Sequence, residues 1–119
     1  VVGIDARGFN FAAAVAARLN AGFIPIRKKG KLPSTTYESA YELEYGEGIV
    51  EIHEDAIRPG ENVLLIDDLL ATGGTAEAAL KLLDGLGANI IGVSFLIELT
   101  FLDGRSKLGT RPITSLICY

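Results

Sequence analysis

Several residue types are rare or missing in the 119-residue sequence, which has no methionine, no tryptophan, one cysteine and one histidine. The single cysteine, Cys118, excludes a disulfide within the chain, and we expect its side chain to be buried in the last strand. We predict a structural role for the single histidine, His53. No apolar run approaches the ~20 residues of a membrane-spanning helix. With no signal peptide visible, we expect a cytoplasmic protein with no membrane partner.

The length of the chain is typical of one domain, and we treat residues 1–119 as a single core domain. The chain begins without a methionine in an apolar stretch, so we expect a further segment to precede it. The net charge of −4 argues against a broad surface for nucleic acid. Basic residues are nevertheless clustered at Arg27, Lys28, Lys29 and Lys31. This cluster is either a solvated loop or an anion clamp.

Apolar patterns alternate between short buried runs and helical periodicity, which predicts an α/β fold with a mainly parallel sheet. We expect helices from about residue 10 to 20, with Phe11, Val15 and Leu19 at four-residue spacing, and from about 75 to 86. Predicted strands cover 1–5, 22–28, 62–67, 89–99 and 114–119. Residues 36–46 and 49–54 alternate in polarity and predict an inserted antiparallel hairpin, with its turn at 47–48.

Charged residues follow the strands at their carboxyl ends, where ligands bind in parallel sheets. They are Asp5 and Arg7, then the pair Arg27 and Lys28, then Asp67 and Asp68. Since parallel strands end at the same edge of the sheet, we expect these three groups to meet at one site.

The loop over residues 68–75 combines small residues with hydroxyls directly before a helix, which is typical of a phosphate-binding site. The alternative is an ordinary tight turn in which Thr75 caps the helix. The loop has no lysine and no G-x-G-x-x-G pattern, which argues against triphosphate and dinucleotide sites. Asp67 and Asp68 would repel phosphate but accept hydrogen bonds from hydroxyls, so a sugar monophosphate is the ligand we predict. A solvated strand end is the alternative for these two acids.

The stretch VLLIDDLLATGGT, residues 63–75, closely resembles the phosphoribosyl pyrophosphate (PRPP) motif of type I phosphoribosyltransferases. GIDARGF, IRKKGKLP, YELEYG, IELTFLDGR and SLICY extend the resemblance, in order, to the adenine phosphoribosyltransferases over essentially the whole chain. The resemblance implies a type I phosphoribosyltransferase-like twisted sheet flanked by helices. It also implies the purine-salvage reaction of adenine with PRPP, giving AMP and diphosphate.

By this resemblance, the 5′-phosphate lies in the loop formed by Ala71, Thr72, Gly73, Gly74 and Thr75, and Asp67 and Asp68 face the ribose hydroxyls. The pyrophosphate would be bound by Arg7 and Gly8 and by the basic residues Arg27, Lys28 and Lys31. Glu44 is the predicted general acid, which delivers a proton to N7 of adenine while N9 attacks. Tyr45 would either cover the pyrophosphate or pack the hairpin, and in the family the peptide bond before Ala6 can be cis.

The resemblance also implies Mg²⁺ bound mainly through PRPP oxygens, with no protein ligand indicated, and a homodimer. The resemblance implies an N-terminal hood segment over the base, which we expect to precede residue 1, so base recognition rests on overall similarity. Two alternatives stay open. One is a regulator with the same fold that binds PRPP or a nucleotide without catalysis; the other is transfer to another purine base.

Overall fold

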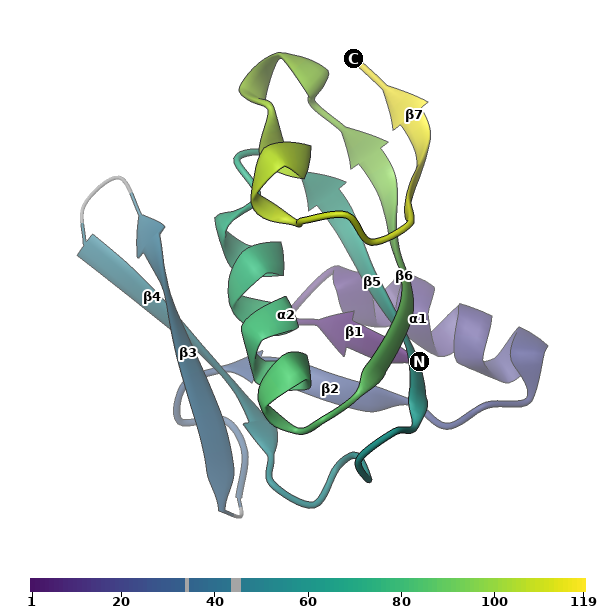
Figure 1. The fold of residues 1–119 in the computed structure, drawn as a ribbon, viewed down its shortest axis with the longest axis vertical. Coiled ribbons are helices and arrows are strands. Elements are labelled where there is room, and N and C mark those ends of the chain that lie inside the picture. The colour runs from purple at the N-terminus through teal and green to yellow at the C-terminus, as the bar shows by residue number, and fades with distance from the viewer. Residues whose placement is uncertain (34, 44–45) are drawn as a thin grey trace.

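The computed structural model describes residues 1–33, 35–43 and 46–119. Its centre is a seven-stranded sheet with the strand order β3-β4-β2-β1-β5-β6-β7 (Figure 1). The strands are β1 (Val2–Ile4), β2 (Ile24–Lys28), β3 (Thr36–Leu43), β4 (Gly46–His53), β5 (Asn62–Leu70), β6 (Asn89–Glu98) and β7 (Ile113–Cys118). Strands β2, β1, β5, β6 and β7 are parallel, and the hairpin β3–β4 joins antiparallel to β2. The predicted mainly parallel sheet with an inserted hairpin is confirmed.

Two helices cover opposite faces of the sheet: α1 (Gly8–Leu19) lies behind it and α2 (Gly74–Gly85) in front of it in Figure 1. The connection from β1 through α1 leads to β2 on one side, and the connection from β5 through α2 leads to β6 on the other. Because parallel crossovers are right-handed, opposite directions of travel place the two helices on opposite faces. The strand order therefore reverses between β1 and β5, which is where open α/β sheets form their ligand sites.

Helix α1 packs through small residues rather than through the large ones that define its apolar spacing. Its buried positions are Gly8, Ala12 and Ala16, and a Cβ on Gly3 of β1 would lie 2.6 Å from the Cβ of Ala12. This close approach leaves Phe11 38% exposed. The helix ends at Asn20 in the left-handed conformation, two residues before the glycine expected to close it.

Helix α2 supplies most of the aliphatic side chains that pack on the other face of the sheet. Leu80, Leu82 and Leu83 are buried there against strand residues such as Leu65 and Phe95. Burying one such side chain contributes about 1.5–3 kcal/mol. This packing fixes the N-terminal end of α2 at the carboxyl edge of β5. Among the described residues no helix is long and apolar enough to cross a membrane.

Two local predictions were wrong. Residues 47–48 do not form the hairpin turn, because Glu47 and Gly48 are paired in β4 with Glu42 and Tyr41 of β3. Gly48 is needed there for packing, since a Cβ at this position would overlap the Tyr41 ring. Cys118 is exposed rather than buried: β7 is the edge strand of the described sheet, and its last three residues are all exposed.

Candidate active site

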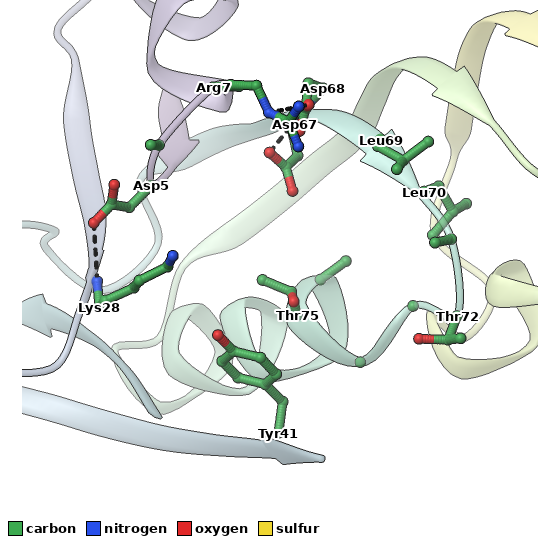
Figure 2. A pocket seen from close by; sticks show the side chains of 15 residues that line it. Asp5, Arg7, Lys28, Tyr41, Asp67, Asp68, Leu69, Leu70, Thr72 and Thr75 are labelled. Atoms are coloured by element: carbon green, nitrogen blue, oxygen red, sulfur yellow. Dashed lines mark hydrogen bonds and ion pairs between the residues drawn. The ribbon is translucent and has the colours of Figure 1, made fainter. Parts of the chain in front are cut away.

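A cavity of about 380 Å³ opens at the carboxyl edge of the sheet, where the strand order reverses. It is lined by residues 5–7, Lys28, Tyr41 and the continuous stretch 67–76. Figure 2 shows Asp5 and Lys28 on one side of the cavity and Thr72 on the other, with Asp67 between them. The three charged groups that the sequence placed at strand ends therefore do meet at one site.

The far side of the cavity is formed by the loop between β5 and α2. Strand β5 continues to Leu70, so this loop begins at residue 71 and not at 68 as predicted. The residue preceding the helix is Gly73 with φ +89°, and Thr75 lies within the first turn instead of capping it. A backbone with this φ favours glycine. The helix N-terminus then presents backbone N–H groups and partial positive charge to the cavity, which suits a phosphate.

The two adjacent acids of β5 have different surroundings. Asp67 is 9% exposed, and burial raises the pKa of its carboxyl to about 7. Its Oδ1 accepts a hydrogen bond from the Asp68 backbone N–H at 2.9 Å. Gly8 packs directly against this carboxylate, since a Cβ there would lie 2.6 Å from Oδ1 of Asp67. Asp68 is half-buried, and its Oδ2 lies 3.1 Å from Nε of Arg7.

Opposite the loop, the carboxylate of Asp5 gathers the basic residues. Its side chain is 4% exposed, and Oδ2 accepts the backbone N–H of Lys28 at 3.2 Å. Nε of Arg27 and Nζ of Lys31 each lie 3.7 Å from the same oxygen. Arg27 also stacks over the Phe9 ring, 5.8 Å from its centroid. Three of the four clustered basic residues are thus held at the site, which favours the anion clamp, while Lys29 pairs with Glu38 instead.

Proteins similar to this chain in sequence and in structure belong to one family. The profile of the phosphoribosyl transferase domain family matches residues 1–110. The adenine phosphoribosyltransferase of Roseobacter denitrificans is 63% identical over 108 residues, which cover 91% of this chain and 61% of that protein. The crystal structure of adenine phosphoribosyltransferase from Thermoanaerobacter pseudethanolicus has a TM-score of 0.96 at 52% identity, covering 99% of this chain and 69% of that chain. The chain belongs to the adenine phosphoribosyltransferase family.

A more distant relative shows which molecules a member of the adenine phosphoribosyltransferase family binds. The crystal structure of the Trypanosoma brucei protein is a complex with AMP, pyrophosphate and ribose-5-phosphate. It has a TM-score of 0.92 at 32% identity and covers 98% of this chain and 54% of that chain. The present chain therefore spans between 54% and 69% of the length of these three relatives.

The structure brings most of the predicted site residues to the cavity. Arg7, Lys28, Asp67, Asp68, Ala71, Thr72, Gly73, Gly74 and Thr75 line it. Gly8, Arg27 and Lys31 stand behind this lining, in contact with Asp67 or Asp5. Glu44 and Tyr45 lie outside the described residues, and their roles stay predictions. The peptide bond between Asp5 and Ala6 is cis, which the family resemblance allowed.

Sequence reasoning missed the roles of Asp5 and Tyr41. Asp5 was placed at the end of a strand but not recognised as the common partner of three basic residues, because those contacts span more than twenty positions. Tyr41 lines the cavity from β3, although the alternation over residues 36–46 predicted only that it lies in a hairpin. A local pattern of this kind does not say against which element one face of the hairpin packs.

The acids that line the cavity contact other groups of the protein. Within residues 1–33, 35–43 and 46–119, no group of three His, Cys, Asp or Glu side chains could hold a metal ion. Asp5 pairs with basic residues and Asp68 with Arg7, while Asp67 accepts the backbone N–H of Asp68. His53 lies on β4 away from the cavity lining.

Proposed function

We propose that this chain carries the core of an enzyme that transfers the phosphoribosyl group of PRPP to adenine, giving AMP and diphosphate. One observation carries the proposal: a single cavity joins an anion-receiving loop, two adjacent acids and a cluster of cations. A phosphorylated sugar that bears a pyrophosphate complements these three parts with its phosphate, its hydroxyls and its pyrophosphate, respectively. Membership of the adenine phosphoribosyltransferase family and the ligands of the Trypanosoma brucei relative support the same substrate.

The two sides of the cavity divide the substrate between them. The loop at 71–75 and the helix N-terminus receive the 5′-phosphate, and Asp67 and Asp68 accept hydrogen bonds from the ribose hydroxyls. On the other side, Arg7, Lys28 and the cations held by Asp5 receive the pyrophosphate. Arg7 has a side chain 79% exposed, so it can turn from Asp68 toward an incoming pyrophosphate. The anomeric carbon then lies between the acids and the departing group.

The chemical step breaks the bond from the anomeric carbon to pyrophosphate and forms a bond from that carbon to N9 of adenine. Positive charge develops on the sugar, and the nearby carboxylate of Asp68 favours it. Glu44 is the proposed acid–base group at N7 of the base: N9 loses its proton as it bonds to the sugar, and a proton that Glu44 places on N7 returns to its carboxylate, so that AMP carries neither. Tyr45 is the proposed cover over the pyrophosphate. Both lie outside the described residues, so they enter from the family resemblance alone.

Three further parts of the proposal come from the resemblance. Mg²⁺ would bind PRPP oxygens and waters, and its chemistry when bound is to neutralise the pyrophosphate charge. We also propose that the protein acts as a homodimer and in the cytoplasm.

The proposal is tested by pyrophosphate release from Mg-PRPP with adenine, hypoxanthine and guanine supplied separately. The assay uses this chain and a version extended at its N-terminus by the corresponding segment of a relative. We expect adenine-dependent release from the extended version, and its loss when Glu44→Ala and Asp68→Ala are combined. Release with hypoxanthine or guanine instead would reassign the base. Saturable PRPP binding with no release for any base would leave a non-catalytic regulator.

A further inference from the structure

Behind the phosphate-binding loop lies a second segment, residues 100–108, that touches the loop without reaching the cavity. It contains two short 3₁₀ turns, Thr100–Leu102 and Gly104–Lys107. A Cβ on Gly73 would lie 2.6 Å from the carbonyl oxygen of Gly104, and a Cβ on Gly104 would overlap the carbonyl oxygen of Ala71. The two backbones are therefore in direct contact at glycines. The position of the Gly104 backbone therefore restricts the positions of the Ala71 and Gly73 backbones.

An ion pair between the buried Glu98 and the partly exposed Arg105 holds this second segment in place. Glu98, the last residue of β6, has a side chain only 5% exposed. Arg105 donates to it from Nε at 2.8 Å and from Nη2 at 2.8 Å, and Ser115 of β7 donates from Oγ at 2.7 Å. Nη1 of Arg105 also donates to the backbone carbonyl of Ile113 at 3.2 Å. Such a two-pronged contact fixes direction as well as distance.

The pair lies next to Gly104 in the chain and apart from the cavity in space. Arg105 directly follows Gly104, so the position of its guanidinium determines the position of the carbonyl that meets Gly73. Glu98 is joined to the other end of the loop as well, since the next residue, Leu99, donates its backbone N–H to Leu70 at 2.9 Å. Neither Glu98 nor Arg105 lines the cavity. Any effect on a ligand must therefore pass through the loop.

We propose that Glu98 and Arg105 are positioning residues that set the geometry of the 5′-phosphate loop through the Gly104–Gly73 contact. A phosphate site made of backbone N–H groups works only if those groups are held in the bound arrangement before the ligand arrives. The loop has no lysine to compensate for a poor arrangement. Glu98 and Arg105 supply this rigidity from outside the site. The inference rests on the proposed function, because it assumes that the loop receives the sugar phosphate.

The experiment measures dissociation constants for ribose 5-phosphate and for inorganic pyrophosphate by calorimetry, with thermal unfolding recorded for each variant. Arg105→Ala should weaken ribose 5-phosphate binding by about tenfold, the scale of one lost charge-assisted contact, and leave pyrophosphate binding unchanged. Arg105→Lys keeps the charge but loses the fork, so it should fall between Arg105→Ala and the unaltered chain. Should Arg105→Ala fail to fold, Arg105→Lys carries the same comparison.

Arg111→Ala is the matched control, because it also removes an ion pair between an arginine and a carboxylate, here that of Asp84. Nη2 of Arg111 lies 2.6 Å from both carboxylate oxygens of Asp84, and neither residue lines the cavity. Unchanged affinity for both ligands is expected. Equal losses for the two ligands in Arg105→Ala or Arg105→Lys, or the same selective loss in Arg111→Ala, would overturn the positioning role. If the unaltered chain binds pyrophosphate but no ribose 5-phosphate, the proposed function is wrong, and this inference, which depends on it, is wrong as well.

Discussion

Asp67 is expected to make the folded protein less stable as the pH rises, because its burial raises the pKa of the carboxyl from 3.8 to about 7. Between these two values the folded chain holds a proton that the unfolded chain has released. Stability therefore falls with increasing pH through this window and levels off above pH 7. A difference of about three pKa units corresponds to about 4 kcal/mol at most. Asp67→Asn removes the titration while keeping the shape and the Oδ1 acceptor for Asp68.

We therefore expect Asp67→Asn to resemble the unaltered chain in stability at pH 4 and to exceed it by up to about 4 kcal/mol at pH 8. Urea unfolding, followed by circular dichroism at several pH values, gives the two curves. Asp55→Asn, at an exposed turn, is the control and should not change the slope with pH. A gap between Asp67→Asn and the unaltered chain that stays constant from pH 4 to pH 8 would refute the linkage argument.

Two substitutions test the packing that supports the site. Gly8→Ala places a methyl group 2.6 Å from Oδ1 of Asp67 and should cost about 1–3 kcal/mol in unfolding free energy. Gly22→Ala, which meets no atom within 4 Å, should cost far less, and equal costs in urea melts would contradict this account. Leu83→Ala, at a position with 0% exposure, should cost about 2–5 kcal/mol. Leu116→Ala, 72% exposed, should have almost no effect on the melting temperature, and a loss as large as that of Leu83→Ala would show that β7 is covered in solution.

The alternation of patterns along the chain was enough to predict the architecture. Short apolar runs and a helical period come from local geometry, so β1, α1 and β5 were placed within a few residues. The site was predictable at the same level, because Asp67 and the loop after it are contiguous in the sequence. The resemblance to a known family then assigned roles to residues that spacing alone could not connect.

The errors share a physical cause, which is that packing partners distant in the sequence decided the outcome. Gly48 looked like a turn residue but lies in a strand, because the Tyr41 ring occupies the space of a side chain. Phe11 defined the apolar spacing of α1, yet the helix approaches the sheet through its alanines. Cys118 is exposed together with its neighbours Leu116 and Ile117 in β7, the edge strand of the described sheet. In each case the local pattern was correct and the neighbour was unknown.

The position of β1 has a consequence for how the protein is made. This strand has three residues, stands between β2 and β5, and pairs Val2 with Leu65, which is far along the chain. The ribosome therefore releases β1 and β2 long before it has synthesised β5, the strand that pairs with the other edge of β1. Contacts between distant segments form slowly, and unpaired apolar strands aggregate in the meantime. We expect the two halves of the ligand site to join late in folding, when β5 arrives and pairs with β1.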